Sequence, residues 1–140
     1  MTSNDFTSAV RSAFSFLMTE CGYFVKEEQA GTSFDHAAVT FGSERLRIKV
    51  SRDRGFVGYE VRPIKGFGSC DDETLRLLVS GATRYQASDE PRTLESLAGW
   101  LRENLDKIEA LFAPLQPTAT MKRVRSLGED RANVLFSGPR

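Results

Sequence analysis

Residues Arg45 to Val50 alternate strictly between a charged and an apolar side chain, and this alternation constrains the fold more than any other feature. A period of two sends successive side chains to opposite faces of a β-strand, so the charged ones face water and the apolar ones face a core. Runs rich in strand-forming residues over 37–41 and 56–61 flank this strand, with short turns between them. The pattern predicts an antiparallel meander of three to four strands, which opens near Tyr23.

Two longer segments have the period of amphipathic helices. Apolar residues recur at steps of three and four from Asp5 to Cys21, and again from Leu94 to Phe112. A short helix between them begins at the acidic group Asp71-Asp72-Glu73, whose carboxylates suit a helix N-terminus. The order helix, meander, short helix and long helix predicts an α+β fold, with the helices packed on one face of the sheet.

Residues 1–117 are expected to form a single α+β domain, because about 100 to 150 residues is the commonest size for one core. Hydrophobic residues make up 40% of the chain, which is enough to build such a core. The hydrophobic pattern weakens after Pro117. We expect 118–140 to be a weakly structured tail of short strands, a helix or a partly ordered segment, either docked on the domain or separate from it.

The 19 basic and 19 acidic residues balance, so the net charge alone indicates no nucleic-acid partner. The charges are nevertheless distributed unevenly along the chain. Seven basic and two acidic residues lie between Arg45 and Lys65, an excess of five positive charges. Residues 71–109 have an excess of four negative charges. This distribution makes the meander the predicted binding surface.

The alternation places Arg45, Arg47 and Lys49 on the solvent face of the sheet, where they are available to a partner. Charged side chains also occupy ordinary solvated strand faces, so the same pattern fits a surface without a partner. The predicted partner-binding residues are four arginines, one lysine and two aromatic residues: Arg45, Arg47, Lys49, Arg52, Arg54, Phe67 and Trp100.

The sequence contains one histidine, His36, and two cysteines, Cys21 and Cys70. A histidine acts as a general base or activates a cysteine nucleophile only within hydrogen-bonding reach of its partner. No second ligand lies near His36 at the spacing of a metal site, and the acidic group 71–73 lacks the spacing of a calcium loop. We therefore expect no catalytic residue, no metal and no cofactor. An enzyme centred on His36 is the less favoured alternative.

The N-terminus lacks the basic region and apolar run of a signal peptide. No stretch of the sequence reaches the ~20 apolar residues that a membrane span requires. We expect a cytoplasmic protein with reduced thiols and no membrane partner.

Three segments together resemble a known layout. They are a helix that ends at Cys21-Gly22-Tyr23-Phe24, a meander that includes Leu46-Arg47-Ile48-Lys49-Val50 and Val57-Gly58-Tyr59-Glu60-Val61, and a helix with Leu94, Leu97 and Leu101. The layout of residues 6–112 resembles that of small bacterial proteins grouped with the immunity proteins of polymorphic or contact-dependent toxin systems. The resemblance implies a non-enzymatic protein that neutralises a cognate toxin by covering its catalytic cleft or locking its conformation. It identifies no individual functional residue, and the neutral charge argues against a nuclease as the toxin.

Two alternatives remain open. The layout is also similar to that of type III secretion chaperones, which are small homodimers that hold a segment of an effector protein, although those chaperones are typically acidic. A nucleic-acid-associated protein would use the basic strand together with Lys122-Arg123-Val124-Arg125. The protein is expected to be a monomer or a homodimer with a protein partner.

Overall fold

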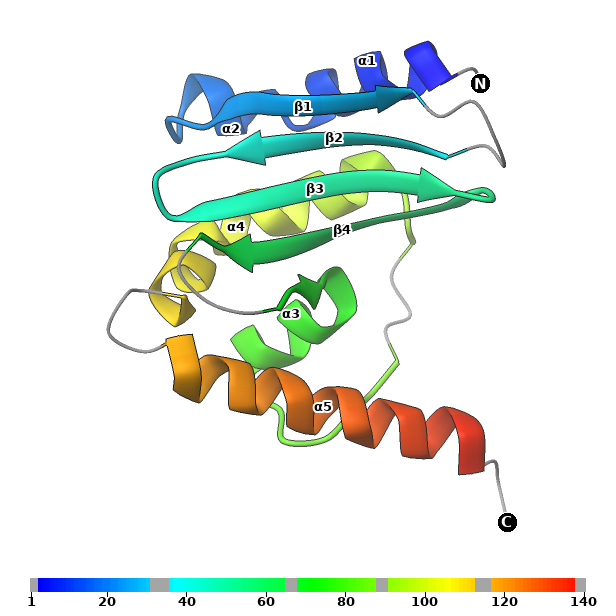
Figure 1. Ribbon diagram of the computed structural model, residues 1–140, viewed down its shortest axis with the longest axis vertical. Coiled ribbons are helices and arrows are strands. Elements are labelled where there is room, and N and C mark those ends of the chain that lie inside the picture. The colour runs from blue at the N-terminus through cyan, green and yellow to red at the C-terminus, as the bar shows by residue number, and fades with distance from the viewer. Residues whose placement is uncertain (1–2, 31–35, 65–67, 88–90, 113–116, 138–140) are drawn as a thin grey trace.

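The computed structural model describes residues 3–30, 36–64, 68–87, 91–112 and 117–137. Five helices and five strands are present within these residues (Figure 1). In chain order they are α1 (Ser3–Ala13), α2 (Ser15–Thr19), β1 (Phe24–Ala30), β2 (Ala37–Gly42), β3 (Leu46–Asp53), β4 (Phe56–Pro63), β5 (Cys70–Asp71), α3 (Asp72–Ser80), α4 (Leu94–Leu111) and α5 (Pro117–Ser137). The predicted α+β class is confirmed.

The five strands form one antiparallel sheet in the order β1-β2-β3-β4-β5. Strands β3 and β4 are joined by a two-residue turn, since Asp53 pairs with Phe56. Both turn residues have positive φ, 53° at Arg54 and 82° at Gly55, as a type I′ hairpin requires. The meander is therefore confirmed, with β5 as a short additional strand.

The predicted alternation in β3 is confirmed. Leu46, Ile48 and Val50 are fully buried, whereas Arg47 and Lys49 on the opposite face are half-buried. In Figure 1, α1 and α4 lie behind the sheet, on the face to which the buried residues of β3 point. The hydrophobic core therefore lies between this face and the helices.

The predicted N-terminal helix is broken into α1 and α2 at Phe14, where φ is −103° and ψ is 18°. The break places Phe14 in the centre of the core. Its ring centroid lies 6.3 Å from those of Phe16, Phe41 and Tyr59. Aromatic pairs at this separation add to the stability gained from burial. Phe16, which lies off the apolar stripe of the sequence, is also buried.

The predicted starts of α3 and α4 are confirmed by their N-caps. The Asp71 carboxylate accepts a hydrogen bond of 2.8 Å from the Thr74 N–H, and Thr93 Oγ1 accepts one of 3.1 Å from the Ser96 N–H. These side chains satisfy N–H groups that have no partner within the first helical turn. The caps fix where each helix begins.

The segment after Pro117, for which we expected weak structure, forms helix α5. Its residues Thr120, Val124, Leu127 and Arg131 are spaced at helical intervals and are buried or half-buried, and the helix contacts α3. Exposed polar residues surround this narrow stripe, so the helical period is weak in the sequence alone. Burial against α3 therefore adds to a weak local preference.

Replacement of Leu127 by alanine tests whether α5 packs on the domain in solution. Leu127 is 2% exposed, so we expect Leu127→Ala to lower the free energy of unfolding by about 2–4 kcal/mol through loss of buried apolar volume. Leu135→Ala is the matched control, because Leu135 is 56% exposed and its loss should change stability by less than about 0.5 kcal/mol. Urea unfolding followed by circular dichroism measures both. Equal effects of the two variants would contradict the packing of α5.

Candidate functional site

One face of the sheet lies open. Among the described residues, no helix covers the face opposite α1 and α4 (Figure 1). We call this the outer face, and residues of β1 to β4 lie on it, among them Glu27, Thr40, Arg47, Lys49, Ser51, Gly58, Glu60 and Arg62.

Strand register interleaves charges of opposite sign on the outer face. Glu27 pairs with Thr40, Thr40 with Lys49, and Lys49 with Glu60, so one row of side chains crosses four strands. Glu60 in turn pairs with Asp71 of β5. The positive excess of the meander is therefore not a continuous basic surface.

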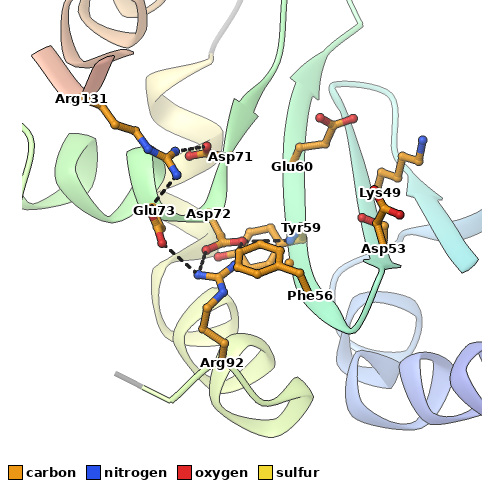
Figure 2. Close-up of a pocket in the computed structure, with 12 residues that line it drawn as sticks. Lys49, Asp53, Phe56, Tyr59, Glu60, Asp71, Asp72, Glu73, Arg92 and Arg131 are labelled. Carbon is orange, nitrogen blue, oxygen red and sulfur yellow. Dashed lines mark hydrogen bonds and ion pairs between the residues drawn. The ribbon is translucent and has the colours of Figure 1, made fainter. Parts of the chain in front are cut away.

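A hollow of about 250 Å³ lies on the outer face where β4 meets the start of α3 (Figure 2). Lys49, Ser51 and Glu60 of β3 and β4 line one side of it, and Asp72 and Arg92 line another. The hollow brings a strand surface, a helix N-terminus and the segment before α4 into one site.

Asp72 and Arg92 form a two-pronged ion pair in the wall of this hollow. Arg92 Nη1 lies 2.8 Å from Asp72 Oδ1, and Arg92 Nη2 lies 2.8 Å from Asp72 Oδ2. The Tyr59 N–H donates to Asp72 Oδ2 at 3.0 Å, and Arg92 Nη2 donates to the Val57 carbonyl at 3.0 Å. The Asp72 side chain is buried and Arg92 also lies over the Phe56 ring, 4.4 Å from its centroid. The pair therefore holds β4, α3 and the segment before α4 together.

The contact with Asp72 also favours the protonated, charged form of Arg92. Hydrogen bonding to the Asp72 carboxylate raises the pKa of Arg92 above its ordinary value, and the charge of that carboxylate acts in the same direction. The Arg92 guanidinium therefore stays charged throughout the physiological pH range.

A second arginine ties α5 to the same site. Arg131 Nη1 lies 2.7 Å from Asp71 Oδ2, and Arg131 Nη2 lies 3.2 Å from Glu73 Oε2. Figure 2 shows Glu73 between Arg131 and Arg92, and it lies 3.4 Å from Arg92 Nη1. The acidic group 71–73, which we expected to complement the helix dipole, thus also anchors two arginines.

Two of the predicted partner-binding residues, Arg47 and Lys49, lie on the outer face. Arg54 lies at the tip of the β3–β4 hairpin. Arg45 lies in the β2–β3 turn and reaches toward α4, with Nη1 3.9 Å from Glu109 Oε2. The basic residues therefore do not form one surface.

Arg52 and the two aromatic residues do not add to the outer face. Arg52 is only 7% exposed, and its guanidinium carbon lies 4.9 Å from the Phe6 ring centroid, on the side of α1. We expected Arg52 in a turn, but β3 continues to Asp53, so Arg52 shares the inward face with Val50. Trp100 is half-buried on α4, where Arg76 lies 5.1 Å from its ring centroid. Phe67 lies outside the described residues.

The fold separates His36 from both cysteines. His36 directly precedes Ala37 at the start of β2, whereas Cys21 precedes β1 at the end that pairs with Gly42. The five steps from Ala37 to Gly42 span roughly 17 Å. Cys70 pairs with Val61 of β4, and Val61 pairs with Ile48 of β3. The β3 residue that pairs with Ala37 is Arg52, which lies four residues, or about 13 Å, from Ile48 along the strand. Neither thiol lies within hydrogen-bonding reach of His36.

Within the described residues, no group of three or more metal-ligating side chains is close enough to hold a metal ion. No helix in the described ranges has the length and apolar content needed to cross a membrane. Comparison of the chain with protein family models, with curated proteins and with solved structures gave no significant match.

Sequence reasoning missed Arg92 and Arg131. Each lies many positions from its acidic partner, and no local spacing links an arginine to a carboxylate across a fold. The burial of Arg52 had a signal, because the alternation of Leu46, Ile48 and Val50 extends to position 52 if the turn has only two residues.

Replacement of Gly58 by alanine tests the packing of the ion pair against β4. A Cβ atom at position 58 would lie 2.8 Å from both Arg92 Nη2 and Asp72 Oδ2. We expect Gly58→Ala to lower the free energy of unfolding by about 1–3 kcal/mol, because the pair must shift to make room. Gly99→Ala on α4 is the control. A Cβ there meets open space, and alanine should stabilise the helix by up to about 1 kcal/mol. If the Gly58→Ala variant were as stable as the Gly99→Ala variant in urea unfolding, the close contact of Gly58 with Arg92 and Asp72 would be ruled out.

The Cys70 thiol makes the free energy of unfolding depend on pH in the alkaline range. Burial raises the pKa of Cys70, and the charges of Asp71 and Asp72 raise it further. Well below pH ~8.5 the Cys70 thiol is protonated in both the folded and the unfolded protein. Above that pH the thiol ionises only in the unfolded chain, so the free energy of unfolding falls by up to about 1.4 kcal/mol per pH unit. We expect the stability of Cys70→Ala to fall less steeply than that of the wild type between pH ~8.5 and ~10. If the stability of the wild type and of Cys70→Ala fell in parallel with pH, the Cys70 thiol would ionise as easily in the folded protein as in the unfolded chain.

Proposed function

We propose that this protein is a non-enzymatic protein-binding module and that its outer face docks the partner. The observation that carries the proposal is the open sheet face, whose charged side chains stand in register around two adjoining hollows. These hollows measure about 250 and 170 Å³ and share Lys49 and Glu60 in their walls. A sheet fixes the backbone and the spacing of its side chains, so little backbone conformational freedom is lost when a partner docks.

The interleaved charges favour a protein partner over a nucleic acid. Binding to a phosphate backbone requires a run of unopposed basic groups. On the outer face Glu27 and Glu60 belong to the same row as Lys49, and a carboxylate there would repel phosphate. Phe56 lines the larger hollow and stays 59% exposed, although Arg92 lies over one face of its ring, so the charges alone favour a protein partner. A protein surface can match both signs of charge.

We further propose that the partner is a toxin and that binding neutralises it. This assignment rests on the resemblance in layout to immunity proteins, which act by occluding a toxin. A type III secretion chaperone would also use a fixed surface, but it would bind an effector segment without abolishing a toxic activity. The biological effect of the captured partner therefore separates the two.

Blocking the outer face tests the docking proposal. Ser51→Trp places a large ring in the larger hollow, which Ser51 lines, without changing the core. Ser126→Trp on the exposed surface of α5 is the matched control. Pull-down from the native host should recover one protein with the wild type and Ser126→Trp, with recovery reduced about tenfold or more by Ser51→Trp. Equal recovery by Ser51→Trp and Ser126→Trp would exclude the outer face as the docking surface.

Co-expression tests the finer assignment. The captured protein is expressed in a sensitive host alone, with the wild-type chain and with Ser51→Trp. We expect growth to stop in the first and third cases and to recover in the second. A partner that is harmless on its own would leave the binding module standing and would overturn its assignment as an immunity protein.

A further inference from the structure

Three basic side chains gather at one corner of the outer face, and we propose that they receive a carboxylate side chain from the docked partner. We call Arg47, Lys49 and Arg62 the cationic corner. This inference deepens the proposed function, on which it rests, by naming the chemistry of the partner segment.

Strand register sets two of these cations directly against each other. Arg47 of β3 pairs with Arg62 of β4, and Lys49 lies two residues along β3 on the same face. Like charges at directly opposed positions of an antiparallel pair destabilise a sheet. The arrangement therefore calls for an anion that offsets the repulsion.

Glu27 and Glu60 lie in the same hollow, but neither forms a salt bridge with the cationic corner. No carboxylate among the described residues lies within the 4.0 Å of a salt bridge from Arg47, Lys49 or Arg62, although Glu60 is the cross-strand neighbour of Lys49. Elsewhere arginines do find carboxylates: Arg11 contacts Glu28, and Arg102 contacts Glu20. The cationic corner is thus a cluster of three basic side chains without a carboxylate in salt-bridge contact among the described residues.

Arg47 is held in position by the backbone around it. Its Nη1 donates to the Ser43 carbonyl at 2.7 Å, and its guanidinium packs over Gly42, where a Cβ atom would lie 2.8 Å from Nη1. Neither Nε nor Nη2 of Arg47 donates a hydrogen bond to the described residues. These two atoms remain available to a ligand and are already oriented, which favours recognition of a planar carboxylate.

The hollow at the corner fits one carboxylate and its neighbouring atoms. It measures about 170 Å³, several times the roughly 30 Å³ that one water occupies in the liquid. Its ionisable lining consists of the cationic corner plus Glu27 and Glu60, which leaves one excess positive charge. A single negative charge balances this excess, whereas the second charge of a phosphate dianion would leave the filled hollow with a net negative charge. The occupant we assign is therefore an aspartate or glutamate of the partner.

A matched pair of peptides tests the assignment. The probes are acetyl-Ala-Glu-Phe-Ala-amide and its Gln counterpart, which differ only in charge, together with inorganic phosphate. Binding is followed by the backbone amide signals of Arg47, Lys49 and Arg62 in two-dimensional NMR spectra. We expect the Glu peptide to bind about tenfold more tightly than the Gln peptide, in a manner that weakens as salt is added.

Neutralising variants complete the test. Arg62→Gln should reduce the affinity for the Glu peptide to that for the Gln peptide, whereas Lys122→Gln, at an exposed lysine of α5, should leave it unchanged. Equal binding of the two peptides, or saturation by phosphate at lower concentration than by the Glu peptide, would overturn the assignment. If these outcomes occur while Ser51→Trp still abolishes capture of the partner, the docking proposal stands and the cationic corner alone is refuted. Selective binding of the Glu peptide without any captured partner would refute the docking proposal instead.

Discussion

The ion pair between Asp72 and Arg92 is the interaction on which the larger hollow depends. It joins the first residue of α3 to the Tyr59 N–H and the Val57 carbonyl of β4, and to the segment before α4. Removing Arg92 would leave the buried Asp72 carboxylate without its charged partner, which destabilises the fold. The wall of the hollow is thus fixed by the fold and is formed before a ligand arrives, which lowers the cost of ordering on binding.

The strand register decides what the charges of the meander mean. In the sequence, basic residues dominate from Arg45 to Lys65. In the folded sheet the Arg52 side chain points inward to the Phe6 ring. Lys49 lies on the outer face, between its cross-strand neighbours Thr40 and Glu60. Of the other basic residues described in this segment, Arg45 and Arg54 lie in turns, and only Arg47, Lys49 and Arg62 gather at one corner of the outer face. A local sum of charges therefore describes the surface poorly when neighbouring strands contribute acids to the same row.

The predictable parts of this fold are those governed by local rules. The alternation in β3, the caps Asp71 and Thr93, and the apolar stripe of α4 each depend on residues a few positions apart. The break at Phe14 and the docking of α5 depend on tertiary packing, which overrides local preference. The candidate site is the least predictable part, because Arg92 and Arg131 meet their carboxylates only through the folded chain.

Two features of the outer face break a local rule of sheet design, and only one is explained by the fold. Glycine weakens a strand interior, but Gly58 is required here because Arg92 and Asp72 occupy the space of its side chain. The opposed pair of Arg47 and Arg62 has no salt-bridge partner among the described residues. Departures from local rules that the fold does not explain are expected at functional sites. Arg47 and Arg62 line a hollow whose ionisable side chains carry one excess positive charge. We therefore assign this corner as the binding site for a carboxylate of the partner.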